Sequence, residues 1–180
     1  MTRPMRRDAA RNRDRLLREA AGVFTEQGLT GSLEEIARRA GVSIGTLYNH
    51  FPTRDALIDE LVPARLAELD DLAARAAAEP DAWRACAGFV DALLTRLTAD
   101  RGLREAFTGD HPAAAQAAAA CERGMMHLSA VLDRARTAGA LRADATDADV
   151  AHLIWMLSQL GEDAARRRAQ KFVLDGLRPR

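Results

Sequence analysis

The stretch SLEEIARRAGVSIGTLYNHF, residues 32–51, decides the fold class of this chain. Four apolar residues recur in it at the spacing of one helical face: Leu33, Ile36, Ala37 and Ala40. Ser32 followed by Glu35 is the pattern of a capping box, so the first helix begins at this serine. Gly41 closes that helix, and Ser43 is placed to cap a second, shorter one. The sequence therefore predicts two helices joined by a tight turn.

The short second helix divides its side chains between two faces. At 100° per residue, one face holds large apolar residues: Ile44, Leu47, Tyr48 and Phe51. The other face holds small and polar residues: Ser43, Gly45, Thr46, Asn49 and His50. We expect the apolar face to dock on neighbouring helices and the polar face to point outward. Such a pair is a helix-turn-helix, whose second helix offers one side to the major groove of DNA. A solvated helical hairpin without a DNA role has the same spacing.

The composition indicates an all-α chain. Ala, Leu, Glu and Arg are abundant, whereas Val and Ile are too sparse for a sheet protein. We expect a first helix over about 8–27, ended by Gly28, and a long helix from Thr53 that Pro63 kinks or breaks near Val62. Further helices are expected at about 81–98, 101–108, 112–138, 146–162 and 164–177.

Charge is unevenly distributed along a chain whose formal net charge is zero. Residues 1–55 carry 10 Arg against 7 acidic residues, so residues 56–180 carry the compensating excess of acid. This asymmetry suggests that the N-terminal part meets a polyanion. Arg6 and Arg7 belong to the basic start of the chain. It is either a solvated tail or an arm that follows DNA phosphates or enters the minor groove.

Several classes of protein are excluded by what the sequence lacks. Cys86 and Cys121 are far apart, and the histidines have no metal-ligand spacing, so we expect no disulfide, metal or cofactor. The chain has no nucleophile elbow, Gly-rich phosphate loop or HExxH, which argues against an enzyme. It also has no secretory signal and no run of 18 apolar residues, so we expect a cytoplasmic protein without a membrane partner.

Residues 9–61 resemble the DNA-binding region of the TetR family of transcriptional regulators. The hallmarks are Ile36-Ala37, Ala40-Gly41-Val42-Ser43, Gly45-Thr46-Leu47-Tyr48, His50-Phe51 and Leu57, preceded by Leu17, Ala20-Ala21, Phe24 and Gly28. Beyond residue 61 the chain is similar to the family in layout only. The resemblance implies a basic arm at 1–8, a three-helix DNA-binding domain at 9–55 and a larger helical ligand-binding and dimerisation domain at 56–180.

The resemblance also assigns residues to the DNA interface. Phosphate contacts fall on Ser32, on Tyr48, and on Arg54, which stands where the family usually has lysine. The groove-facing set is Ser43, Gly45, Thr46, Asn49 and His50. Ile44 departs from the Lys, Arg or Pro of many members. It either packs inward, which the helical projection favours, or meets a thymine methyl group.

The C-terminal domain concentrates its larger side chains at a few places. Candidates for an effector pocket are Trp83, Phe89, Phe107, Met125 and Trp155, although each also suits plain core packing. Candidates for a dimer interface lie on apolar stripes of the last two helices: Val150, Leu153, Leu157, Phe172 and Val173. These stripes alternatively cover the protomer's own core.

Together these features predict a homodimeric repressor that binds an inverted-repeat DNA operator and is released by a small, largely apolar effector. Two alternatives stay open. One is an activator or global DNA binder of the same family. The other is a helical interaction module without DNA binding.

Overall fold

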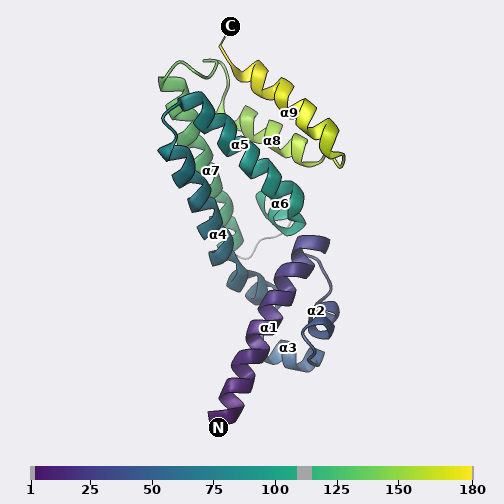
Figure 1. Ribbon diagram of the computed structural model, residues 1–180. Helices are drawn as coiled ribbons and strands as arrows, with labels where there is room; N and C mark the ends of the chain where they lie inside the picture. Colours follow the sequence, from purple (N-terminus) through teal and green to yellow (C-terminus); the bar gives the residue numbers. More distant parts are fainter. Residues whose placement is uncertain (1–2, 109–114, 180) are drawn as a thin grey trace. The chain divides into compact units, whose positions relative to one another are not determined.

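The computed structural model describes residues 3–108 and 115–179, and every regular element in those ranges is an α-helix (Figure 1). In chain order the helices are α1 (Arg3–Gln27), α2 (Leu33–Arg39), α3 (Ile44–His50), α4 (Arg54–Ala78), α5 (Ala82–Ala99), α6 (Arg101–Thr108), α7 (Ala115–Thr137), α8 (Asp147–Ser158) and α9 (Asp163–Leu177). The expected all-α class is confirmed. Within the described ranges, no helix is long and apolar enough to cross a membrane.

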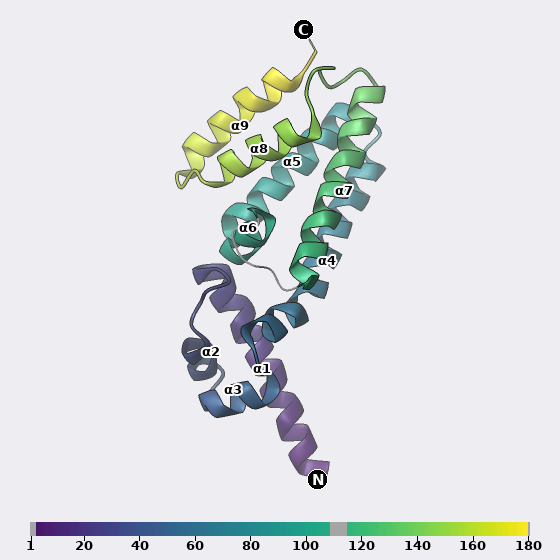
Figure 2. The ribbon, with the colours of Figure 1, turned by 180° about the vertical axis from the view of Figure 1, so that it is seen from behind.

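The helices form two compact units. The first comprises Met1–Arg65 and Asp100–Ala119, and the second comprises Leu66–Ala99 and Ala120–Arg180. Helix α4 contributes to both units. Helix α6 belongs to the first unit. The domain boundaries expected from the sequence placed residues 101–108 in the C-terminal domain. Helix α6 packs against α1 (Figure 2).

The first unit is built around α1, with α2 and α3 on one side of it (Figures 1 and 2). Its centre consists of side chains with no exposed surface: Leu16, Ala20 and Val23 from α1, Ile36 from α2, Leu47 from α3 and Leu57 from α4. These residues are the apolar positions that recur at helical spacing in the sequence. Burial of that stripe stabilises the unit, since short helices such as α2 and α3 are marginal in water on their own.

One helix boundary differs from expectation, and one helix continues past the proline at which the sequence predicts a kink or a break. Helix α1 begins at Arg3, so the basic segment expected as an arm is continuous with the first helix. Helix α4 runs through Pro63 without a break. A proline removes one backbone hydrogen bond and crowds the preceding turn. The rest of α4 keeps its helical bonding on both sides of that position.

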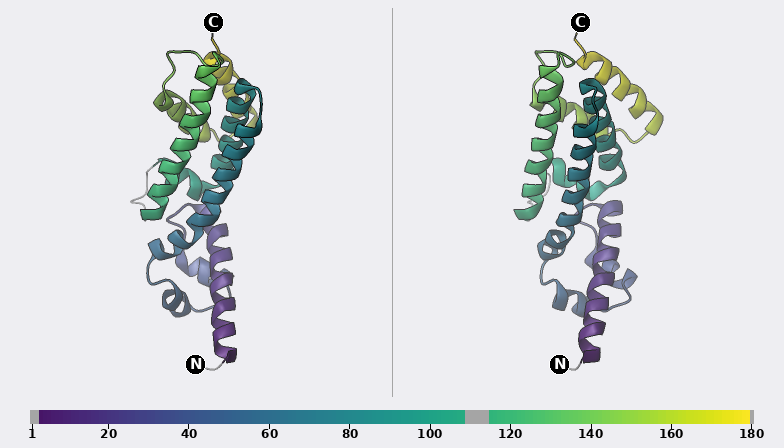
Figure 3. Two further views of the ribbon diagram at one scale, coloured as in Figure 1. Left: turned by 90° about the vertical axis from the view of Figure 1, so that its left-hand side faces the viewer. Right: turned by 60° about the vertical axis from the view of Figure 1, so that its left-hand side comes forward.

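The second unit packs α5 against α8, with α9 beside α8 (Figure 1), and α7 runs along the C-terminal part of α4 (Figure 3). The guanidinium of Arg134 on α7 donates to the carbonyls of Ala76 at 3.0 Å and Pro80 at 3.0 Å. It therefore caps the end of α4, where carbonyls have no helical partner and a cation is favoured. The predicted start of α8 is confirmed, because Thr146 and Asp149 form both halves of a capping box.

Candidate DNA-binding interface

The turn before α3 fixes how that helix leaves the protein. Gly41 has φ of 66°, a conformation that glycine adopts without steric cost, and the Val42 amide donates to the Ala37 carbonyl at 3.0 Å. The Ser43 hydroxyl then accepts the Thr46 amide at 3.2 Å and caps α3. The predicted turn and cap are therefore both present.

Helix α3 turns most of its surface outward. Leu47 and the following Phe51 are buried, as the apolar face predicts, and hold the helix against the unit. The outer face is exposed at Ser43, Gly45 and Asn49, and half-buried at Thr46 and His50. The residues assigned to the groove therefore share one accessible surface.

Two apolar residues of α3 do not pack inward. Ile44 is 37% exposed and Tyr48 is 46% exposed. The expectation that Ile44 packs inward is therefore wrong. The pair is four residues apart on the same helix, so both side chains lie on one side of α3. Exposure leaves the Tyr48 hydroxyl accessible to a phosphate and the Ile44 methyl groups accessible to a base.

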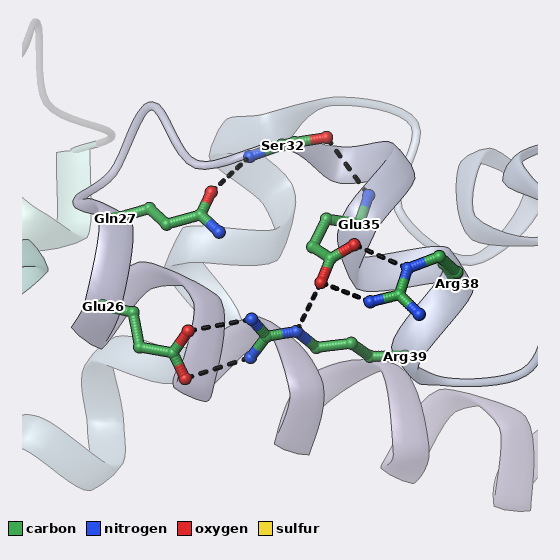
Figure 4. Close-up of polar contacts among 6 residues, drawn as sticks. All are labelled: Glu26, Gln27, Ser32, Glu35, Arg38 and Arg39. Atoms are coloured by element: carbon green, nitrogen blue, oxygen red, sulfur yellow. Dashed lines mark hydrogen bonds and ion pairs between the residues drawn. The ribbon is translucent and has the colours of Figure 1, made fainter.

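A network of ion pairs fixes α2 to α1 (Figure 4). Arg39 forms two hydrogen bonds with Glu26, at 3.0 and 2.8 Å, and a third with Glu35 at 2.8 Å. Arg38 forms a second bidentate pair with Glu35, at 2.7 Å for each bond. The hydrogen bonds from Arg38, which has the larger effect, and from Arg39 lower the pKa of Glu35 to about 2. The hydrogen bond from Arg39 likewise lowers the pKa of Glu26.

Ser32 caps α2, but the predicted capping box is only half formed. The Ser32 hydroxyl accepts the Glu35 amide at 3.1 Å, whereas the Ser32 amide donates to the Gln27 side chain at 3.4 Å (Figure 4). The Glu35 carboxylate is held by the two arginines instead. The Ser32 hydroxyl itself donates to Glu34 at 3.0 Å, so a DNA phosphate at this position has to compete with that carboxylate.

Arg54 lies at the start of α4 and holds the loop between α1 and α2. Its guanidinium donates to the carbonyls of Leu29, at 3.0 Å, and Gly31, and its central carbon lies 6.0 Å from the centre of the Phe24 ring. This half-buried position gives Arg54 a structural role that the sequence did not indicate. A phosphate contact by its remaining N–H groups stays a prediction.

The basic segment lies along α1. The backbones of Arg6 and Arg7 are helical, and their side chains lie outside the described residues. Arg13 pairs with Glu60 at 2.5 Å and lies over the Phe51 ring, which ties α1 to α4 and to the end of α3. Three arginines further along the same helix are exposed: Arg11, Arg15 and Arg18.

The residues expected to form an effector pocket differ in how far they are exposed. Phe89 is buried in the core, Trp155 is 45% exposed, and Trp83 carries the Arg178 guanidinium 4.8 Å from its ring centre. Met125 is half-buried, and the side chain of Phe107 lies outside the described residues. A groove lined by α4 and α7 has mostly small residues along its walls: Ala73, Ala74, Ala77, Ala130 and Val131. Its volume is about 570 Å³.

The expected dimer residues divide between the core and the surface. Val150 and Leu157 are buried within the protomer, and Leu153 and Val173 are half-buried. Phe172 is 73% exposed on α9. The exposed apolar surface also includes Leu160, which belongs to the apolar stripe expected at the dimer interface, and two residues of α8 that the sequence did not indicate as interface: Trp155 and Met156. Apolar spacing in α8 identified the buried stripe but not which neighbouring residues remain uncovered.

Cys86 and Cys121 do not form a disulfide with each other, and Cys86 is buried. Burial raises the pKa of the Cys86 thiol to about 11, which keeps it protonated and unreactive at neutral pH. Among the described residues, no group of three or more His, Cys, Asp or Glu side chains is arranged to hold a metal ion.

The fold and this site define a helix-turn-helix protein, and comparisons with known proteins extend that conclusion. Residues 16–61 match the family model "Bacterial regulatory proteins, tetR family", and residues 79–179 match "Transcriptional regulator SbtR-like, C-terminal domain". A TetR transcription regulatory protein from Mycobacterium vanbaalenii is 34% identical, with 98% of this chain and 100% of that chain covered and a TM-score of 0.63. The chain belongs to the tetR family of bacterial regulatory proteins. It is a DNA-binding transcriptional regulator and not an enzyme.

Two further relatives differ in how much they share with this chain. The transcriptional repressor KstR2 of Mycobacterium tuberculosis is 41% identical over 51 residues, which are 28% of this chain and 26% of that protein. The chain therefore matches about a quarter of that curated relative's length. The regulator FadR of Bacillus subtilis, solved in complex with stearoyl-CoA, is 14% identical and shares the fold, with a TM-score of 0.66 over 91% of this chain and 98% of that one.

Proposed function

We propose that this regulator is a repressor that binds an inverted-repeat operator as a homodimer and is released by a small, largely apolar effector. The observation that carries DNA recognition is the outer face of α3. Its polar residues are accessible together, whereas Leu47 and Phe51 hold the helix in place from behind. A helix presented in this way enters the major groove, where side chains of this kind meet base edges.

The exposed apolar side chains of the last two helices support a dimer. Trp155, Met156, Leu160 and Phe172 lie on α8, its C-terminal end and α9, which pack side by side. Aromatic and Met side chains are enriched at protein interfaces, and exposed groups of them mark interaction sites. A symmetric dimer supplies two recognition helices for two half-sites about one helical turn of DNA apart.

An effector is supported by the groove between α4 and α7 in the second unit. Alanines line most of it, and Asp70, Arg123 and His127 form a polar cluster beside them. Such a site suits an apolar molecule with a polar group at one end. FadR of Bacillus subtilis, which shares this fold, was solved in complex with stearoyl-CoA, a molecule with a long apolar chain attached to a polar group. The five aromatic and Met residues expected from the sequence remain a second location to test.

Gel-shift titration of the full-length protein against fragments of its own genome tests DNA binding, and sedimentation tests the dimer. We expect a dimer whose binding weakens steeply with salt, by about 0.9 in the log–log slope for each phosphate neutralised. A monomer at micromolar concentration, or binding indifferent to salt, contradicts the proposal. A promoter–reporter assay separates repression from activation.

A further inference from the structure

Leu29 lies in the loop that leads from α1 to α2, and side chains from two other helices hold both of its backbone polar groups. Its amide donates to a carboxylate oxygen of Glu105 on α6 at 2.8 Å. Its carbonyl accepts from Arg54 on α4 at 3.0 Å. Leu29 is 6% exposed, so these bonds satisfy groups that water does not reach easily. The loop is therefore held from both sides three residues before Ser32 caps α2.

The Glu105 carboxylate can occupy this position only because residue 28, just before Leu29, is a glycine without a side chain. Gly28 has φ of 84°, and a Cβ atom built on it would lie 2.2 Å from the other carboxylate oxygen of Glu105. The Gly28 amide meanwhile donates to the Phe24 carbonyl at 2.9 Å and ends α1. The carboxylate thus rests directly on the turn between the two helices.

We propose that Glu105 is a positioning residue for DNA binding, acting through the Leu29 amide. By fixing the loop, it sets where α2 begins and so holds α2 and α3 ready for DNA. Without that bond, the loop and α2 must be ordered when DNA binds, and the cost reduces affinity. This inference rests on the proposed binding of operator DNA by the helix-turn-helix.

The position of α6 in the chain gives this contact a second consequence. A single residue, Asp100, separates α6 from α5 of the second unit. The Asp100 side chain caps α6 through the Leu103 amide at 2.9 Å and pairs with Arg65 at 2.6 Å. Any rearrangement that pulls on α6 therefore acts on the Leu29 loop through Glu105, in addition to acting through α4.

The sign of the mutational effect distinguishes positioning from simple electrostatics. Removing an acidic side chain from a DNA-binding protein reduces its repulsion of phosphates and is expected to strengthen binding. Loss of the contact with Leu29 predicts the opposite, a weaker complex. Since Glu105 acts within the protein, the salt dependence should stay unchanged.

The test uses the full-length protein, its selected operator duplex and a random duplex of equal length. We expect Glu105→Ala to bind the operator about tenfold more weakly, the lower end of what a hydrogen bond to a charged group contributes. Hydrogen exchange at the Leu29 amide should accelerate. Glu105→Gln keeps an acceptor oxygen and should restore most of both readouts. Arg101→Ala removes an ion pair with Glu105, which measures 2.9 Å, and leaves the bond to Leu29 in place. It serves as the matched control, with affinity near that of the wild type.

Operator affinity equal to or above that of the wild type in Glu105→Ala would overturn the inference while leaving the proposed function intact. Unchanged exchange at Leu29 in that variant, or equal weakening in Glu105→Gln, would also overturn it. If the wild-type protein binds neither duplex, the proposed function and this inference both fail.

Discussion

Arg39, near the end of α2, donates two hydrogen bonds to the carboxylate of Glu26, near the end of α1, at 3.0 and 2.8 Å. Bidentate pairs of this type constrain orientation as well as distance. Arg39 also donates to Glu35, which lies one turn earlier on α2. The same side chain therefore stabilises α2 internally and attaches it to α1. The angle at which α3 is presented depends on this attachment.

The ion pairs around Glu35 predict acid sensitivity. Its pKa in the folded protein is about 2, below the ordinary value of 4.5, so its contribution to stability is fully present above pH 4.5. That contribution declines as the pH falls from 4.5 toward 2, since the unfolded chain takes up the proton first. Urea unfolding of wild type and Glu35→Gln across this range should show the difference between them shrinking with acid. A constant difference contradicts this assignment.

Asn49 and Ile44 should determine which DNA sequence the protein prefers. Both are exposed on α3, so replacing them should leave the fold unchanged. Asn49→Ala should relax preference at particular base pairs, by about 1–3 kcal/mol for a good direct contact. Ile44→Ser should relax preference for thymine where the wild type meets its methyl group. Competition titration with single-base operator variants measures both, and equal losses on every sequence would show that these residues do not read bases.

Residues 1–7 should contribute affinity rather than sequence choice. They carry Arg3, Arg6 and Arg7 and no acidic residue. Their deletion should weaken binding to operator and random DNA alike and reduce the steepness of the salt dependence. Measurement on both duplexes over a series of salt concentrations checks this. A changed consensus at A·T positions would instead show that the segment enters the minor groove.

The dimer surface and the core of the last helices should respond differently to substitution. Phe172→Glu alters an exposed residue, so the helix content should persist while the dimer dissociates and operator binding falls. Leu157→Ala removes a buried side chain and should cost about 2–5 kcal/mol of stability. Sedimentation and urea unfolding separate the two effects. A Phe172→Glu variant that remains dimeric would exclude this surface.

Sequence periodicity predicted the helices and the exposed polar face of α3 well, because both depend on local order. Ser43, Gly41 and the buried Leu47 needed only the spacing of a capped helix and its turn. Ile44 was misplaced because a projection of α3 shows which side is apolar but not how far the neighbouring helices extend. The exposed state of Ile44 follows from packing that the short stretch does not contain.

The long-range contacts could not be predicted from the sequence, for a related reason. Glu105 and Leu29 are 76 positions apart, and no spacing links an acidic residue on α6 to a loop amide. Arg54 was expected at a phosphate by resemblance, whereas its bonds to loop carbonyls depend on how α4 crosses the α1–α2 turn. The half-formed capping box at Ser32 arises similarly, since Arg38 and Arg39 compete for the Glu35 carboxylate.

Selection of bound sequences from a random duplex library tests the central claim most directly. The account predicts a consensus made of two inverted half-sites about one helical turn apart, recovered by the wild-type protein and changed at defined positions by Asn49→Ala. Recovery of no enriched sequence, or of a single half-site without a symmetric partner, would contradict a dimer that reads DNA through two copies of α3.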